Sequence, residues 1–175
     1  MTYLPKKYKI LSVKEYTSDV RLFKIKCNLN PLPGHFIEVS IPGIGECPLA
    51  SCSYNKNEID ILLRNAGNTT SSLFQKKKND EIFIRGPYGK GFPIELLEKK
   101  NLILIAGGTG IAPITSFISY IEQNRKKFGE IFIYFGFRDE ENILLNDRIK
   151  NWKKKFHVYI GLSNDPDTKK YETGY

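Results

Sequence analysis

Four small residues after an apolar run could hold a phosphate group. Residues 102–106 are all apolar, and Gly107, Gly108, Thr109 and Gly110 follow them directly. Residues 111–125 then carry apolar side chains at helical spacing. A strand, a glycine turn and a helix place free backbone N–H groups beside an anion, and glycine allows a close approach. The motif is neither G-x-G-x-x-G nor G-x-x-x-x-G-K-[ST], and a tight turn without a ligand is the alternative.

The first half of the chain predicts antiparallel strands. Short segments that alternate apolar and polar residues, or are rich in β-formers, are separated by turns containing Pro, Gly and Asn. They cover residues 8–13, 22–27, 36–41, 59–63 and 81–84. Strands at this density favour a small antiparallel β-barrel over roughly the first 97 residues.

The second half predicts a different architecture. Strands at 102–106, 131–135 and 157–162 alternate with helices at 111–125 and 146–156. This pattern is typical of an α/β Rossmann-like parallel sheet, and the unbroken apolar run at 102–106 predicts a strand buried on both faces. We therefore expect two domains, 1–98 and 99–175. Three strands and two helices make a small core, so we expect the second domain to be incomplete and the chain to be truncated at its C-terminus.

Composition excludes several classes of protein. The 175 residues carry a net charge of +8, but the lysines lie in short clusters without an interleaved aromatic stripe, so we expect no nucleic acid partner. These lysines form either a solvated face or a docking surface for an acidic protein. No apolar run approaches the roughly 20 residues of a membrane helix, and the N-terminus lacks a signal-peptide core, so we expect a cytoplasmic protein without a membrane partner. Three cysteines without C-x-x-C spacing predict neither a disulfide framework nor a metal site.

Four stretches together carry a family resemblance. They are GECPLASCS at 45–53, LLRNAGNTTS at 62–71, RGPYGKGFP at 85–93 and IAGGTGIAPI at 105–114. In this order and spacing the chain resembles the ferredoxin-NADP reductase superfamily, whose members join a flavin-binding barrel to a pyridine-nucleotide domain. Residues 33–46 and 134–152 are most similar to the B subunits of anaerobic sulfite reductases. Gamma subunits of cytoplasmic hydrogenases and electron-transfer subunits of dihydroorotate dehydrogenase are close relatives.

The resemblance implies where FAD would bind. The superfamily has an R-x-Y-S strand against the flavin, whereas this chain has Cys47 to Ala50 there, so contacts would come from the backbone and apolar packing. Arg64 and the turn at 67–70 would clamp the flavin phosphates, as a guanidinium and a helix start can. The implied FAD positions are Pro48, Leu49, Ala50, Ser51, Leu63, Arg64, Asn65, Gly67, Asn68, Thr69 and Thr70. A core strand without a ligand and a solvated arginine beside an ordinary helix cap are the alternatives.

The resemblance also implies a nucleotide site. The turn from Gly107 to Gly110 would accept the nicotinamide and its diphosphate, and Gly136 and Arg138 would hold the adenosine. Asp139 favours NADH over NADPH, because a carboxylate repels a 2′-phosphate and can bond a ribose hydroxyl. No acid–base pair or nucleophile stands out, so we name no catalytic residue. This agrees with hydride transfer, in which the flavin carries the chemistry.

The function expected from the resemblance is electron transfer. The chain would oxidise NADH through bound FAD and pass electrons through a [2Fe-2S] cluster, which the family carries in a C-terminal segment absent here. Its partners would be iron–sulfur and sirohaem subunits of a sulfite reductase. A gamma-type subunit of a hydrogenase or dihydroorotate dehydrogenase is one alternative. The other is a non-catalytic docking module that has lost its flavin, suggested by Leu49 and Ala50.

Overall fold

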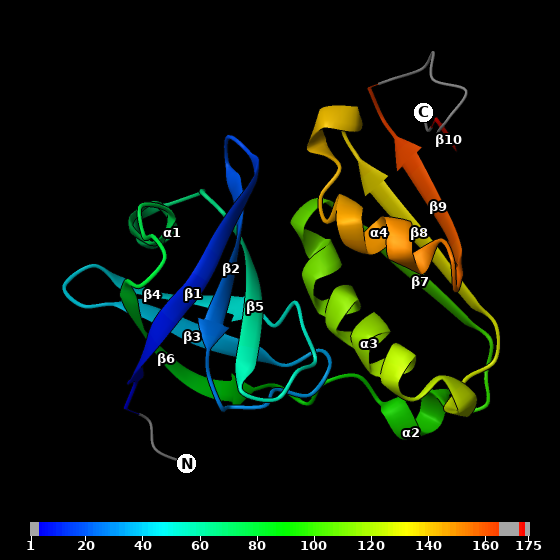
Figure 1. Ribbon diagram of the computed structural model, residues 1–175, viewed down its shortest axis with the longest axis horizontal. Helices are drawn as coiled ribbons and strands as arrows, with labels where there is room; N and C mark the ends of the chain where they lie inside the picture. The colour runs from blue at the N-terminus through cyan, green and yellow to red at the C-terminus, as the bar shows by residue number, and fades with distance from the viewer. Residues whose placement is uncertain (1–3, 165–171, 174–175) are drawn as a thin grey trace.

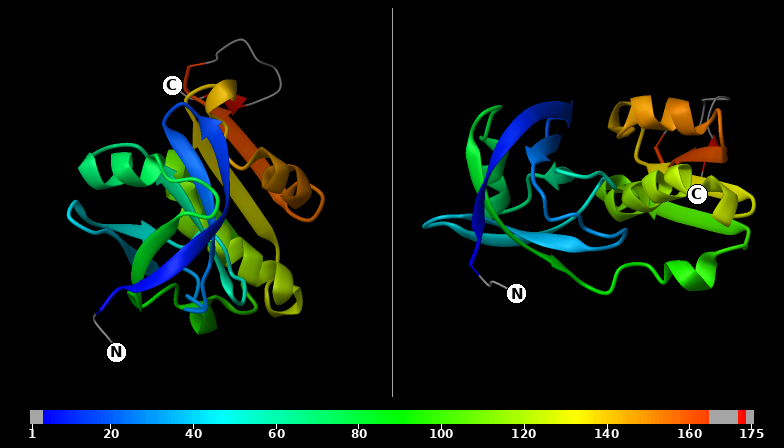
Figure 2. Two further views of the ribbon diagram at one scale, coloured as in Figure 1. Left: turned by 60° about the vertical axis from the view of Figure 1, so that its left-hand side comes forward. Right: turned by 60° about the horizontal axis from the view of Figure 1, so that its bottom comes forward.

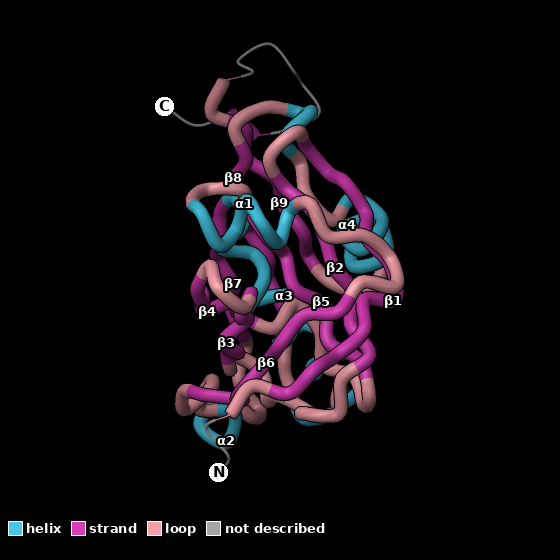
Figure 3. Tube along the Cα trace, turned by 90° about the vertical axis from the view of Figure 1, so that its left-hand side faces the viewer, coloured by secondary structure: helices cyan, strands magenta, loops and turns pink. Residues whose placement is uncertain are grey.

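The protein consists of two sheets that lie side by side (Figures 1 and 2). The computed structural model describes residues 4–164 and 172–173. We call the part that contains the antiparallel sheet the barrel half and the part that contains the parallel sheet the parallel half. A short helix, α2 (Ile94–Leu97), lies between them in the chain, at the end of the molecule away from the carboxyl ends of the parallel strands (Figure 3).

The barrel half is a six-stranded antiparallel sheet in the order β4-β3-β6-β1-β2-β5. An isolated bridge between Ser51 and Ile61, and a bond from the Cys52 amide to the Asp60 carbonyl at 2.7 Å, join its two outer strands. The alternating sequence gives each strand an inward apolar row. The elements are β1 (Lys6–Thr17), β2 (Val20–Lys26), β3 (Phe36–Ile41), β4 (Gly45–Ala50), β5 (Glu58–Arg64), α1 (Asn68–Phe74) and β6 (Glu81–Tyr88). The predicted antiparallel barrel is confirmed.

The parallel half has four strands in the order β10-β9-β8-β7, all parallel. The predicted α/β class is confirmed, although the second helix ends at Trp152 rather than at residue 156. Its elements are β7 (Leu102–Gly107), α3 (Ile111–Gln123), β8 (Ile131–Phe137), α4 (Asn146–Trp152), β9 (His157–Leu162) and β10 (Glu172–Thr173), with short 3-10 turns η1 (Gly108–Gly110), η2 (Arg125–Lys127) and η3 (Glu140–Asn142). The proposed division into domains 1–98 and 99–175 stays a prediction. Among the described residues no helix is long and apolar enough to cross a membrane.

The prediction that residues 102–106 are buried on both faces is wrong. Leu102 and Leu104 are each 7% exposed, whereas Ile103 and Ile105 are 67% and 72% exposed. The inward side chains share a core cluster with residues of α3 and α4, so both helices cover the same face of the sheet. An unbroken apolar run shows that both faces are apolar; it does not say whether the described chain covers both.

One apolar core crosses from one half to the other. Val20, Cys52 and Leu62 of the barrel half belong to the same buried cluster as Phe117 and Ile118 of α3. The second cluster lies inside the barrel itself. The shared cluster holds the two halves together and leaves their facing edges to form the site described next.

Candidate functional site

A cleft of about 860 Å³ opens between the two halves. The turn between β1 and β2 and the end of β5 line it on the barrel side. The carboxyl ends of β7 and β8 line it on the other side, which is the edge where open parallel sheets bind ligands. Its lining residues are Thr17, Ser18, Asp19, Val20, Arg64, Gly107, Gly108, Gly136, Phe137, Arg138, Asn142, Leu144 and Ser163. We call it the inter-half cleft.

Glycines keep one wall of the inter-half cleft free of side chains. Gly107 of β7 and Gly136 of β8 are partners in the sheet register, and Gly108 follows at φ +50°. A Cβ placed on Gly108 or Gly136 would meet no protein atom within 4 Å, so it would project into open space. A positive φ also favours glycine at position 108. The backbone at these strand ends is therefore open to a ligand.

Arg64 brings a positive charge to the cleft from the barrel half. Its Nε lies 3.3 Å from Oδ2 of Asp19, and both side chains are about half exposed. Asp19 is itself fixed, because Thr17 donates its hydroxyl to the carboxylate at 2.6 Å and the Asn65 amide donates to the Asp19 carbonyl at 2.8 Å. Within the described part of the chain the other N–H groups of the Arg64 guanidinium have no partner, so they could bind phosphate oxygens.

A smaller pocket of about 270 Å³ lies at the start of α1. The Thr70 hydroxyl accepts from the amides of Ala66 and Gly67 at 2.9 and 2.8 Å and donates to the Gly67 carbonyl, so it organises the turn. The pocket is lined by Cys47, Ala66, Gly67, Asn68, Thr69 and Thr70. Burial, reinforced by the nearby carboxylates of Glu38 and Glu46, raises the pKa of the Cys47 thiol to about 11, so the thiol stays protonated.

The predicted FAD and nucleotide positions fall into three groups. Those in the inter-half cleft are Arg64, Gly107, Gly108, Gly136 and Arg138, and those in the pocket at α1 are Gly67, Asn68, Thr69 and Thr70. The remainder lie on β4 (Pro48, Leu49, Ala50), just after it (Ser51), at the end of β5 (Leu63), just after β5 (Asn65), and in η1 (Thr109, Gly110). Their assignment to cofactors stays a prediction.

Three of these residues have side chains that are already engaged. Leu63 and Ser51 are each 0% exposed, and the Ser51 hydroxyl donates to the Ser53 carbonyl at 2.8 Å. The Asn65 amide oxygen accepts from the Ser71 hydroxyl at 2.7 Å. If they contact a cofactor, they do so through the backbone.

Asp139 has a structural task in its own loop. Its Oδ1 accepts from the backbone amide and the side-chain amide of Asn142, at 3.0 and 2.6 Å. The side-chain bond from Asn142 lowers the pKa of the Asp139 carboxyl. The neighbouring Arg138 is 73% exposed, with its Nε 3.8 Å from Asp139. The NADH preference drawn from Asp139 stays a prediction, and the exposed cation beside it belongs to Arg138.

Sequence reasoning missed several residues of the inter-half cleft. Thr17, Ser18 and Asp19 lie in an ordinary polar turn between two alternating strands, a pattern that carries no chemical signal of its own. Ser163 could have been found, because it directly follows β9 at the same sheet edge as the glycine ends of β7 and β8.

Comparisons with known proteins agree with this fold. The chain superposes on the crystal structure of a ferredoxin NADP+ reductase from Neisseria gonorrhoeae with bound FAD and NADP. The TM-score is 0.81 over 98% of this chain and 73% of that one, at 20% identity. The fold is that of the ferredoxin-NADP reductases. Residues 104–175 also match the oxidoreductase NAD-binding domain family.

Relatives in sequence are subunits of sulfhydrogenases and of dihydroorotate dehydrogenases. The gamma subunit of sulfhydrogenase 2 from Pyrococcus furiosus is 37% identical over 91% of this chain and 59% of its own length. A probable dihydroorotate dehydrogenase B (NAD(+)) electron transfer subunit from Thermococcus kodakarensis is 32% identical over 83% of this chain and 59% of its own length. Both are homologues of this chain. The chain thus spans about three fifths of the curated relatives that it matches.

Proposed function

We propose that the chain is the FAD- and NAD(P)H-binding part of an electron-transfer subunit. The observation that carries this proposal is the inter-half cleft. Arg64 of the barrel half and the open glycine ends of β7 and β8 line this cleft from its two sides. A cationic donor opposite a side-chain-free backbone edge fits a dinucleotide, which has phosphates to bind and a flat ring to accommodate.

FAD would bind along the barrel half. Arg64 would fork onto its phosphates, and the turn at residues 67–70 would donate backbone N–H groups near α1. The glycines of β7 and β8 would admit the nicotinamide nucleotide from the other side. When bound, the flavin supplies hydride acceptance and single-electron release. The chain's own residues bind, orient and shield the two cofactors.

The partner that receives the electrons is proposed from sequence likeness. The resemblance of residues 33–46 and 134–152 to anaerobic sulfite reductase B subunits supports a sulfite-reducing partner, reached through a [2Fe-2S] cluster outside this chain. The 37% identity to a sulfhydrogenase gamma subunit supports a hydrogenase partner about equally. NADH is the preferred donor in either case, a proposal that rests on Asp139.

FAD uptake by the purified chain tests the proposal. We expect a visible flavin spectrum on purification or after incubation with excess FAD, with one FAD per chain. A chain that takes up no FAD under either condition would contradict the proposal and favour a non-catalytic docking module on the same scaffold.

The terminal partner needs a separate test. Each candidate partner complex, one that reduces sulfite and one that contains a hydrogenase, is mixed with the electron-transfer subunit and NADH. We expect NADH-dependent sulfide formation. Electron transfer confined to the hydrogenase would replace the sulfite assignment and leave the FAD proposal intact.

A further inference from the structure

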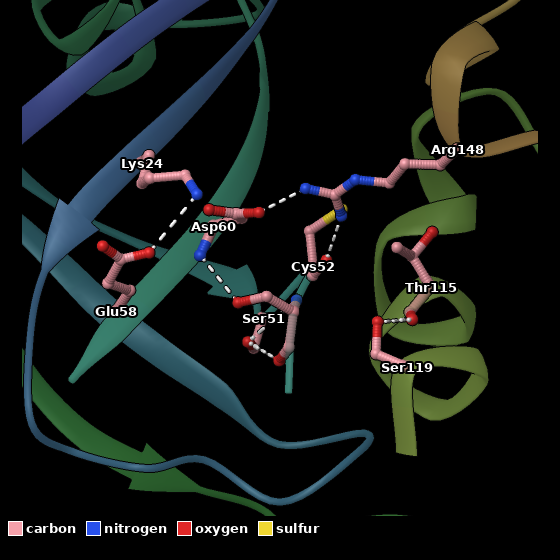
Figure 4. A network of polar contacts seen from close by, with 9 residues as sticks. Lys24, Ser51, Cys52, Glu58, Asp60, Thr115, Ser119 and Arg148 are labelled. Atoms are coloured by element: carbon pink, nitrogen blue, oxygen red, sulfur yellow. Dashed lines mark hydrogen bonds and ion pairs between the residues drawn. The ribbon is translucent and has the colours of Figure 1, made fainter. Parts of the chain in front are cut away.

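A partly buried arginine, whose side chain is 27% exposed, makes contacts across the two halves. Arg148, on α4 of the parallel half, donates Nη1 to the backbone carbonyl of Cys52 at 2.7 Å. Its Nη2 bonds to Oδ2 of Asp60 on β5, an aspartate that is 2% exposed (Figure 4). One guanidinium therefore holds two groups of the barrel half at once.

The two groups that Arg148 binds mark the place where β4 and β5 approach each other. The Cys52 amide donates to the Asp60 carbonyl at 2.7 Å, and Ser51 bridges to Ile61 beside it. Both strands also carry predicted FAD positions close by. Ala50 lies two residues before Cys52, and Arg64 lies four residues after Asp60. We call β4 and β5 the flavin strands. A displacement of the Cys52–Asp60 contact would move both of them together.

On the other side, Arg148 adjoins what we call the nucleotide wall of the cleft, the lining formed by the carboxyl ends of β7 and β8 and the loop that follows β8. It lies in the first turn of α4, which follows directly on the loop containing Arg138, Asn142 and Leu144. All three of those residues line the inter-half cleft. The guanidinium thus connects the loop that faces the nucleotide with the strands that face the flavin.

Few other contacts between the halves can set this geometry. The shared apolar cluster holds the halves in contact, but hydrophobic association is non-directional. The Lys14–Asp147 pair is more than half exposed on both sides and is screened by solvent. Two further hydrogen bonds join α3 to loops of the barrel half rather than to β4 or β5. Gln123 donates to the Tyr54 carbonyl, and the Gly34 amide donates to the Ser116 hydroxyl.

We propose that Arg148 is a positioning residue that fixes the nucleotide wall of the cleft relative to the flavin strands through Asp60 and the Cys52 carbonyl. The expected effect on flavin reduction rests on the proposed function. The expected effect on the relative orientation of the two halves is independent of any cofactor. A planar guanidinium that makes two directed bonds sets both distance and angle, whereas a point charge would set distance alone.

A test of this proposal must remove the Arg148–Asp60 ion pair without leaving either charge unpaired in the interior. Arg148→Met alone would leave the Asp60 carboxylate unpaired in the interior, and that variant could simply fail to fold. The double variant Arg148→Met/Asp60→Leu replaces the ion pair with apolar groups, a change that buried pairs often tolerate. The matched control is Lys155→Met/Glu122→Leu, which removes an ion pair that lies wholly within the parallel half.

Residual dipolar couplings of backbone amides provide the cofactor-free readout. In the wild type and the control, the amides of β1–β6 and of β7–β9 should fit one alignment tensor. In Arg148→Met/Asp60→Leu each half should retain its own structure, but the two halves should need different tensors. A single tensor with the wild-type orientation in this variant would overturn the proposal.

The rate of flavin reduction by saturating NADH provides the second readout. We expect the double variant to bind FAD normally and to lose at least about tenfold in that rate, because hydride transfer depends steeply on the distance between the reacting rings. An unchanged rate despite altered tensors would overturn the catalytic consequence. If the wild type itself is not reduced by NADH, the proposed function fails, and the dipolar couplings still decide whether Arg148 orients the halves.

Discussion

At the scale of single residues, the charged side chains divide into those already committed to the fold and those left free for a ligand. Asp139 caps its own loop, and Glu46 binds Arg85 through both carboxylate oxygens. Arg64, in contrast, makes one ion pair at 3.3 Å and stands half exposed in the inter-half cleft. The sequence pointed to Arg64 only through the family resemblance of residues 62–71, and its role as a ligand residue stays a prediction. It could not predict that Asp19 faces it from the turn between β1 and β2.

Arg64→Ala should weaken FAD binding. Loss of a charge-assisted hydrogen bond to phosphate costs about 1.5–3 kcal/mol, which raises the Kd for FAD by roughly 10- to 150-fold. Equilibrium titration of the apoprotein with FAD measures this. Lys154→Ala removes an equal charge far from the cleft and should leave the Kd unchanged. Equal effects of the two variants would show that Arg64 acts only through net charge.

Glu46 should give the protein a stability that depends on pH. The hydrogen bonds from Arg85 and then from Ser40 lower the pKa of Glu46 to about 2 from 4.5. A carboxyl whose pKa is lower in the folded state stabilises the fold at pH values above its pKa in the unfolded chain. This stability is lost as the pH falls from about 4.5 to about 2. Because the Glu46 side chain is 36% exposed, solvent screening limits the effect to about 1 kcal/mol.

Urea denaturation of the wild type and Glu46→Gln across this pH range measures the effect. The wild type should be the more stable protein at neutral pH, and the difference should disappear toward pH 2. A difference that stays constant with pH would assign the stability to packing of the Glu46 side chain instead.

At the scale of elements, the carboxyl ends of β7 and β8 form part of the side of the inter-half cleft that we propose binds the nucleotide. The sequence predicted both strands and the glycines that follow, because local patterns of apolar residues and glycine specify them. The sequence did not predict which faces of these strands the helices cover. The run at 102–106 was expected to be buried on both faces, yet α3 and α4 cover only one, and Ile103 and Ile105 are exposed. Which face a helix covers depends on crossover direction and chain path, which a single strand's composition does not contain.

Gly136→Val should block the nucleotide wall without harming the fold. A Cβ at Gly136 meets no protein atom within 4 Å, and its φ is not in the left-handed region, so the added side chain would fill the cleft instead of straining the backbone. We expect NADH binding to weaken by at least about tenfold, since a steric block removes close backbone approach. Isothermal titration with NADH measures the change in affinity.

Tyr134→Val is the control for this substitution. Tyr134 lies two residues earlier on β8, on its exposed face, and outside the cleft lining. That variant should bind NADH as the wild type does. A similar loss of affinity in both variants would indicate that β8 as a whole, and not position 136, governs binding.

At the scale of the whole molecule, the two halves share one buried apolar cluster. Phe117 of α3 is 1% exposed and stacks on Phe92 with ring centroids 5.2 Å apart. Cys52 and Leu62 of the barrel half belong to the same cluster. Sequence patterns predicted two architectures in series but not this joint core or the Arg148 contact, because both arise from residues far apart in the chain.

Phe117→Ala should therefore destabilise both halves together. Truncation of a buried phenylalanine costs about 3–5 kcal/mol. Urea unfolding would be followed by Trp152 fluorescence for the parallel half and by hydrogen exchange of β2 and β5 amides for the barrel half. The two transitions should shift by the same amount. A shift confined to Trp152 would show that the halves unfold independently.

The central claim is that the inter-half cleft brings a nicotinamide nucleotide to a flavin held by the barrel half. Anaerobic stopped-flow mixing of the FAD-loaded chain with NADH tests this most directly. The account predicts loss of the oxidised flavin absorption at a rate that saturates with NADH, and that Gly136→Val needs more NADH to reach saturation. A chain that binds FAD but whose flavin stays oxidised in excess NADH and excess NADPH would contradict the account.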